Sequence, residues 1–147
     1  MAVLEREYTV GSTASVGAGL PEAGVELGVT ARYGAGPFLT ELVVRIGLRD
    51  VVVSVADIDW VEAESYLARL HVGGRAYLIR ERMHVLEQRL DPREFARVHR
   101  SAIVNMRRVA EVRRNGRERV LTLVTGARLR ASRRGWSDFK AALRRRT

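Results

Sequence analysis

The chain has 147 residues, about the length of one average domain, and 46% of them are hydrophobic, which is normal for a globular protein. It contains no cysteine, so a disulfide scaffold, a thiolate metal site, an iron–sulfur cluster and a cysteine nucleophile are all excluded. The formal net charge at pH 7 is +9, and every basic residue except Lys140 is an arginine.

The positive charge lies in the last third of the chain. Residues 96–147 carry sixteen basic and three acidic side chains, whereas residues 1–37 and residues 38–95 each have a net charge of −2. A block of one sign is typical of a face that binds a polyanion. The planar, multi-donor head group of arginine suits phosphates and the edges of bases. We therefore expect the last third to contact a polyanion.

The sequence has no pattern of a membrane or export segment. The longest apolar run, at residues 51–56, is far too short to cross a bilayer. Acidic residues stand near the start, where a signal peptide has a basic and then an apolar stretch. The expected location is the cytoplasm, with no insertion into a membrane.

Residues 1–37 hold most of the glycine and keep no regular hydrophobic period. This composition predicts a flexible N-terminal extension, in which a short strand near residues 25–29 is an option. The pattern changes at Phe38, and we place the start of a folded domain there, over residues 38–147.

Four or five short strands are predicted in the next forty residues. Gly73 and Gly74 join two of them in a two-residue turn, which is a strong hairpin signal. Clustered acids in this region are interpreted as charges that protect an edge strand. The predicted strands cover residues 39–46, 51–55, 58–62, 66–72 and 75–79, and the acids are Asp57, Asp59, Glu62 and Glu64.

A helix is predicted over residues 81–90, where apolar residues recur at three- and four-residue spacing. Asp91 then suits the cap of a second short helical turn, with Pro92 at its first position. In that turn Glu94 would complete a capping box.

Short strands then return, and a terminal helix is predicted over residues 133–145 with Ser132 as its N-cap. Many short strands without an alternating strand–helix order predict a mainly β domain. The late strands are predicted at residues 102–104, 106–112, 120–124 and 128–131, with turns at Asn115-Gly116 and Thr125-Gly126.

No arrangement of residues indicates catalysis. The histidines, His71, His84 and His99, form no pair at helical spacing, so no metal site is predicted. His99 and Ser101 lie two residues apart, but no motif supplies the acid and the oxyanion hole that a serine nucleophile needs. We expect no enzyme activity and no cofactor, and the enzymatic alternative is a small hydrolase that uses these two residues.

The strongest candidate for recognition is the segment of residues 97–105. It is interpreted as a connector between a helical turn and a buried strand, and connectors on a rigid scaffold often carry recognition residues. Arg100 can make a bidentate contact to guanine. His99 and Ser101 can donate to phosphates or hold the loop in place.

A second candidate is the start of the terminal helix, because free N–H groups at a helix start attract phosphate. Ser132 caps this helix in the prediction, and Arg133 and Arg134 follow directly. The arginines at residues 144–146 either satisfy the helix dipole or add unspecific attraction to phosphate.

Several of these pieces, in this order, resemble the LytTR-type DNA-binding domain over about residues 38–146. They are Asp-Ile-Asp-Trp-Val-Glu-Ala-Glu at residues 57–64, Leu-Asp-Pro-Arg-Glu-Phe at 90–95, Val-His-Arg-Ser-Ala-Ile-Val-Asn at 98–105, and Ser132-Arg133. The resemblance implies an elongated β sandwich of small antiparallel sheets with two or three short helices. It also implies a bacterial transcription regulator whose loops enter successive major grooves, bend the duplex and bind direct repeats as dimers.

Carried over by position, the resemblance gives Arg100 and Arg133 the role of base readers. A third contact would come from the loop around Glu64, Ser65 and Tyr66. Contacts that position the DNA backbone are then expected from His99, Ser101, Arg134 and Arg107.

The resemblance also bears on regulation. Family members often carry a phosphoacceptor receiver domain, but residues 1–37 are too few for one, so we expect no phosphorylation control in this chain and an unidentified signalling partner instead. The alternative function is a basic β module that binds RNA by stacking aromatic rings on bases. Aromatic residues make up only 6% of the chain, however, and most stand at predicted core positions.

Overall fold

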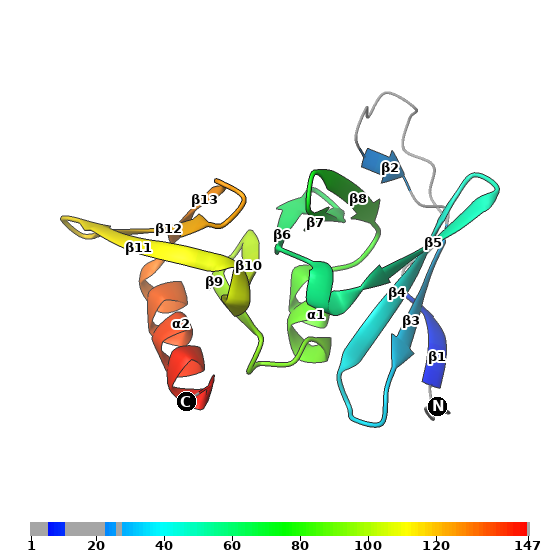
Figure 1. Ribbon diagram of the computed structural model, residues 1–147, viewed down its shortest axis with the longest axis horizontal. Helices are drawn as coiled ribbons and strands as arrows, with labels where there is room; N and C mark the ends of the chain where they lie inside the picture. The colour runs from blue at the N-terminus through cyan, green and yellow to red at the C-terminus, as the bar shows by residue number, and fades with distance from the viewer. Residues whose placement is uncertain (1–5, 11–22, 26–27, 147) are drawn as a thin grey trace.

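A computed structural model describes residues 6–10, 23–25 and 28–146 and shows an elongated, mainly β molecule (Figure 1). The expected fold class of small antiparallel sheets with short helices is confirmed. No helix in the described residues is long and apolar enough to span a membrane. In chain order the elements are β1 (Arg6–Val10), β2 (Ala23–Val25), β3 (Gly28–Tyr33), β4 (Leu39–Ile46), β5 (Arg49–Ser54), η1 (Val55–Asp57), β6 (Trp60–Glu64), β7 (Leu67–Val72), β8 (Arg75–Ile79), α1 (Met83–Arg89), β9 (Phe95–His99), β10 (Ala102–Asn105), η2 (Met106–Arg108), β11 (Val109–Asn115), β12 (Glu118–Leu123), β13 (Arg128–Ala131) and α2 (Arg133–Arg146).

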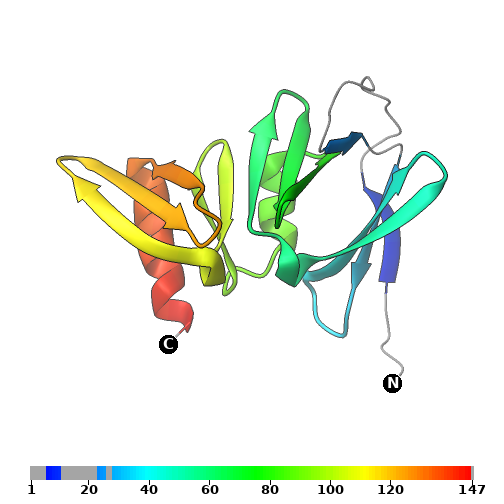
Figure 2. The ribbon, with the colours of Figure 1, turned by 45° about the horizontal axis from the view of Figure 1, so that its top comes forward.

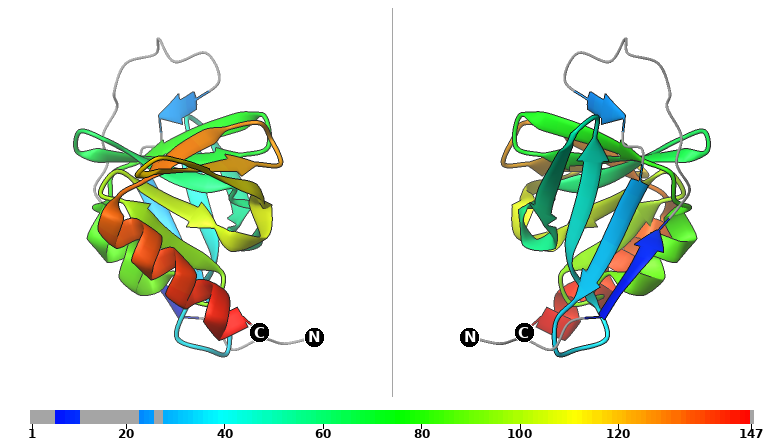
Figure 3. Two further views of the ribbon diagram at one scale, coloured as in Figure 1. Left: turned by 90° about the vertical axis from the view of Figure 1, so that its left-hand side faces the viewer. Right: turned by 90° about the vertical axis from the view of Figure 1, so that its right-hand side faces the viewer.

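The described strands form three sheets that follow one another along the molecule (Figure 1). The strand order is β1-β3-β4-β5 in the four-stranded sheet, β2-β8-β7-β6-β10-β9 in the six-stranded sheet and β11-β12-β13 in the three-stranded sheet. Neighbouring strands are antiparallel, except that β2 and β8 run parallel. The right-hand view of Figure 3 faces the four-stranded sheet, and the left-hand view faces α2.

Strand β3 lies within the predicted N-terminal extension but belongs to the fold. It pairs with β4, and Ala31 at its centre is fully buried. Residues 28–33 thus form a paired strand, because hydrogen bonding to a neighbouring strand can override a weak local pattern. Residues 1–5, 11–22 and 26–27 of the predicted extension lie outside the described residues, and the domain boundary at residue 38 stays a prediction.

Strands β9 and β10 separate two hydrophobic cores. Successive side chains of a strand point to opposite faces of its sheet. Here Phe95 and Ile103 enter a core shared with the four-stranded sheet and α1. Val98 and Val104 enter a second core, shared with the three-stranded sheet and α2. The β9–β10 hairpin is therefore packed on both faces.

The region around Asp91 agrees with the prediction except at Glu94. Asp91 does start a turn, and its carboxylate accepts a hydrogen bond from the Arg93 N–H at 2.9 Å. The Glu94 and Phe95 N–H groups both donate to the Asp91 carbonyl at 2.9 Å, so the predicted short turn forms, and strand β9 follows directly at Phe95. Glu94 completes no capping box, because its carboxylate pairs with arginines from later elements.

Two other segments also differ. Residues 97–101 are the end of β9 and a tight turn into β10, not an irregular connector, because β9 pairs with β10 up to His99. Residues 106–108 form η2, and β11 begins only at Val109. Other strand ends differ from the prediction by a few residues, since pairing with the neighbouring strand fixes where a strand stops.

The acidic cluster around Asp59 does not protect a sheet edge. Strand β6 lies between β7 and β10, and Asp59, one residue before it, is only 4% exposed. Its carboxylate accepts from the Gly73 N–H at 2.8 Å and lies 3.2 Å from Arg108 Nε. The edge interpretation is wrong, and Asp59 instead ties the β7–β8 turn to η2.

Helix α2 approaches β9 very closely at its start. Ser132 is its N-cap, as predicted, since the Ser132 Oγ accepts from the Gly135 N–H at 2.9 Å. The backbone N–H and the hydroxyl of Ser132 donate to the Val98 carbonyl at 2.9 and 3.4 Å. A Cβ on Gly135 would stand 1.7 Å from that carbonyl oxygen, so the approach requires glycine.

The other end of α2 is held by Glu94. Its carboxylate accepts from Arg107 Nε at 2.6 Å and from Arg146 Nη1 at 3.1 Å. Partial burial raises the pKa of Glu94, but the two guanidinium groups outweigh this effect and lower its pKa overall. The cluster joins the end of α2 to the turn before β9.

Replacing Gly135 with alanine is expected to destabilise the fold. The added Cβ would overlap the Val98 carbonyl, and overpacking costs about 1–3 kcal/mol or more. In a helix interior without such a contact the same change stabilises by about 1 kcal/mol. The sign of the change in unfolding free energy, measured in urea, therefore tests the contact. Gly74→Ala is the control, because nothing lies within 4 Å of its added Cβ.

Acid is expected to weaken the attachment of α2. The pKa of Glu94 is lowered on folding, so the stability it contributes is present above its ordinary value of 4.5 and is lost as the pH falls through the folded-state value. Glu94→Gln should unfold at lower urea than the wild type at pH 7, and the two midpoints should converge in acid. A difference between the two urea midpoints that stays constant over this pH range would show that Glu94 does not act through its charge.

Candidate nucleic-acid interface

Two hairpin turns lie side by side at one end of the six-stranded sheet. Strand β6 runs antiparallel to β10, with Glu62 opposite Ala102, so the β6–β7 and β9–β10 turns leave the sheet at the same end. The Ala63 N–H donates to the Ser101 carbonyl at 2.9 Å and joins the two turns. Figure 2 shows both hairpins pointing the same way.

The β9–β10 turn presents the residues of the predicted recognition motif. Arg100 is exposed, and His99 and Ser101 are partly buried. The His99 Nδ1 lies 3.2 Å from the Ser101 backbone N and 2.9 Å from its Oγ. A backbone N–H can only donate, so Nδ1 is an acceptor and the proton of the neutral ring sits on Nε2. That Nε2–H group is a donor available to a ligand.

The start of α2 lies beside this turn. Ser132 binds the carbonyl of Val98, the residue that precedes His99. A hollow of about 300 Å³ opens between the strand, the turn and the helix start. His99, Arg100, Ser132 and Arg134 all line it, so the structure brings the two predicted recognition segments together.

Three arginines of these segments are free to contact a ligand. Arg100, Arg133 and Arg134 are exposed, and no carboxylate of the described residues pairs with their guanidinium groups. Several other arginines of the basic third are neutralised by acids instead. These pairs are Arg97–Glu87, Arg107–Glu94, Arg108–Asp59, Arg113–Glu111 and Arg130–Glu118.

Arg107 is not brought together with the other predicted contacts. It follows β10, at the end of the β9–β10 hairpin opposite Arg100. Its Nε and Nη2 donate to the two carboxylate oxygens of Glu94 at 2.6 and 3.3 Å. A bidentate pair of this kind occupies the guanidinium, so this position favours a structural role for Arg107.

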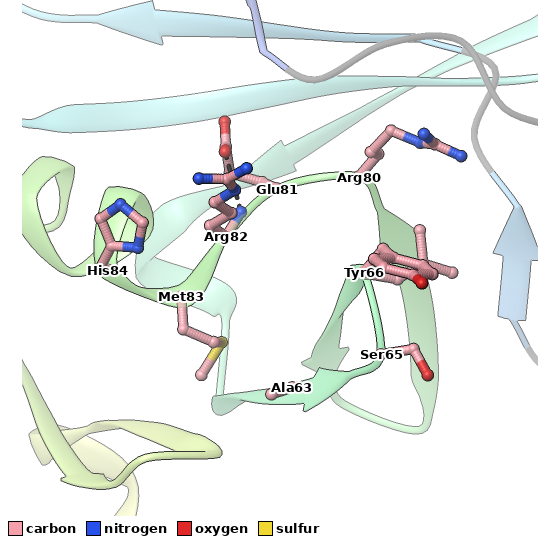
Figure 4. Close-up of a pocket in the computed structure, with 9 residues that line it drawn as sticks. Ala63, Ser65, Tyr66, Arg80, Glu81, Arg82, Met83 and His84 are labelled. Carbon is pink, nitrogen blue, oxygen red and sulfur yellow. Dashed lines mark hydrogen bonds between the residues drawn. The ribbon is translucent and has the colours of Figure 1, made fainter.

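The predicted third contact, the β6–β7 turn, stands next to a basic pocket. Ser65 has a φ of 55°, and Tyr66 is 84% exposed. The turn lines a pocket of about 540 Å³ together with Arg82, just before α1, and His84, in the first turn of α1 (Figure 4). Neither residue was predicted as a contact, because only the pairing of β7 with β8 carries them to this end of the sheet.

The roles of two further residues of the site were not predicted either. Arg97 donates to the Arg100 carbonyl at 2.6 Å, which no local pattern predicts. Gly135 allows the helix start to reach β9. A glycine inside an otherwise regular helical stripe was the available signal for this close approach.

A metal site and an RNA-binding face each need a particular group of side chains. No group of three or more metal-ligating side chains is found among them. Trp60 stacks on His71 at 4.2 Å between ring centroids, and Trp136 stacks on Phe139 at 5.7 Å. Both tryptophans pack against the second core, so they do not form the open aromatic face that the RNA alternative requires.

Comparison with known proteins identifies relatives for most of the chain. Residues 49–144 match the model of the LytTr DNA-binding domain. The chain is 31% identical over 100 residues to the CO-responsive transcriptional regulator RcoM of Rhodospirillum rubrum, an alignment that covers 68% of this chain and 42% of RcoM. The chain thus spans about two fifths of the length of that relative.

A solved LytTr DNA-binding domain from Bacillus cereus has the same fold, with a TM-score of 0.64 at 19% identity. The likeness covers 71% of this chain and 96% of that domain. The range matched by the family model includes both turns and the start of α2. This chain therefore belongs to the LytTr DNA-binding domain family.

Proposed function

We propose that the chain binds duplex DNA at specific sequences and regulates transcription. The observation that carries this proposal is the common hollow of the β9–β10 turn and the start of α2, lined by Arg100 and Arg134. Unpaired guanidinium groups on rigid elements can make bidentate contacts to bases and phosphates. We assign base reading to Arg100 and Arg133, and contacts to the DNA backbone to His99, Ser101 and Arg134.

The order of the elements suggests how a duplex would lie. Neighbouring strands are about 4.8 Å apart, so the β6–β7 and β9–β10 turns are separated by only about 10 Å. Successive major grooves lie about 34 Å apart along straight DNA. These contacts are closer together than that spacing, so in this proposal the duplex bends toward the protein, and the β6–β7 turn with Ser65 and Tyr66 and the helix start enter neighbouring grooves on either side of the β9–β10 turn.

The family relationship also supports a proposal for assembly. We expect two copies to bind direct repeats as a dimer on DNA and the input signal to come from a partner. Sedimentation of the protein with duplexes that carry one or two copies of the selected site will give the stoichiometry. A single copy on the two-site duplex at saturation would contradict this arrangement.

Arg100→Ala is expected to remove the preference for the target. The target is first obtained by selection from a random duplex library at a stated salt concentration. Loss of a bidentate base contact costs about 1–3 kcal/mol of discrimination, so the affinity for the target should fall by about five- to 150-fold. Affinity for random duplex should change much less, and titration of both duplexes measures the difference.

Arg145→Ala is the matched control, because Arg145 is exposed near the end of α2, away from the turn. Loss of a phosphate contact should weaken binding to both duplexes alike and reduce the slope of log affinity against log salt by about one. Equal and uniform losses for Arg100→Ala and Arg145→Ala would show that Arg100 does not read bases.

A further inference from the structure

We propose that Arg97 is a positioning residue, which holds the β9–β10 turn in its recognition geometry by linking the Arg100 carbonyl to Glu87 of α1. The inference rests on the proposed function, since it concerns how the turn that carries Arg100 is fixed. Arg97 therefore has a different role from His99 and Arg100, which are proposed to contact DNA, although the three residues lie close together in the sequence.

The guanidinium of Arg97 contacts two groups at once. Its Nη1 donates to Glu87 Oε1 at 3.1 Å, and its Nη2 donates to the Arg100 carbonyl at 2.6 Å. The side chain is 22% exposed, so most of it is packed against the protein. Arg97 and Glu87 both line the hollow beside Arg100. The link therefore forms part of the wall of the proposed DNA-binding site.

The turn is held from two sides. The Arg100 carbonyl is bound through Arg97, and the next carbonyl, that of Ser101, accepts from the Ala63 N–H at 2.9 Å. Helix α1 is a firm anchor for the first link, because Met83 and Leu86 are buried in the first core. Without Arg97 one of these two attachments of the turn is lost.

Loss of that attachment has a consequence for base reading. Hydrogen bonds weaken steeply with poor angles, and a bidentate contact needs both donors aligned with the base edge. A shift of the Arg100 backbone by a fraction of an ångström is amplified at the end of its long side chain. Preference for the target then falls although Arg100 itself is unchanged.

The first test is Arg97→Lys, which preserves the charge. Lysine is a point donor without a fork, so it cannot bind Glu87 and the Arg100 carbonyl in the same way. We expect unchanged affinity for random duplex and an unchanged salt slope, because no phosphate contact is lost. The preference for the selected target should fall by roughly three- to tenfold, a part of what a direct base contact contributes. A preference equal to that of the wild type would overturn the proposal.

The second test is Glu87→Gln, for which two explanations predict opposite signs. Removing an acid beside a surface that binds a polyanion raises the affinity for every duplex if only electrostatics matter. Loss of the link between Glu87 and Arg97 instead lowers the affinity for the target, while the affinity for random duplex stays constant or rises. If Arg97 contacted DNA directly, freeing it from Glu87 would strengthen target binding, and that result would overturn the proposal.

Glu111→Gln is the matched control. It breaks a more exposed pair, in which Arg113 Nη2 lies 3.3 Å from Glu111 Oε1, and removes the same charge. The pair does not touch the turn, so the preference for the target should be kept. Urea midpoints of all variants show whether each one is folded.

A double variant separates the link from independent effects. If Arg97 and Glu87 act as one unit, the double variant Arg97→Lys, Glu87→Gln should lose no more preference for the target than the single variant with the larger loss. Additive losses would overturn the link. A wild-type chain that enriches no site in the selection overturns the proposed function itself, whereas an enriched site that both variants still prefer as strongly overturns only the role of Arg97.

Discussion

The contact between helix α2 and strand β9 depends on Gly135, which has no side chain to keep the two backbones apart. The Val98 carbonyl accepts from the Ser132 N–H, and Gly135 lies directly against the same oxygen. One backbone oxygen of β9 therefore fixes both the cap and the first turn of the helix. Because Val98 precedes His99, this contact sets the helix start beside the β9–β10 turn, and the shared hollow of the two segments follows from it.

Packing on both faces makes the β9–β10 hairpin a rigid support for this site. Alternating side chains enter two separate cores, so the hairpin cannot tilt without disturbing one of them. The four-stranded sheet extends the first core through β3, whose Ala31 is buried. The segment before the family match thus contributes to the stability of the scaffold, and the turns at the end of the six-stranded sheet carry the exposed polar groups.

The arginines of the basic third divide into two classes by their partners. Arg97, Arg107 and Arg146 bind carboxylates or backbone carbonyls and join elements of the fold. Arg100 and Arg133 are exposed with no carboxylate partner in the described part of the chain. The count of sixteen basic residues in this third therefore overstates the number of cations that are free to meet a polyanion, and the net charge of +9 says nothing of where they lie. The ion pairs decide both.

Local chemistry was readable from the sequence alone, and partners distant in the sequence were not. The cap at Ser132, the Gly73-Gly74 turn and the mainly β pattern depend on residues a few positions apart, and each was predicted. Arg107 was predicted as a DNA contact, yet its partner Glu94 lies 13 positions away and meets it only after folding. Asp59 likewise became a buried, paired group because β6 is central in its sheet. Short-range hydrogen bonds fix turns and caps, whereas the pairing of charges depends on which strands and helices the tertiary fold places side by side.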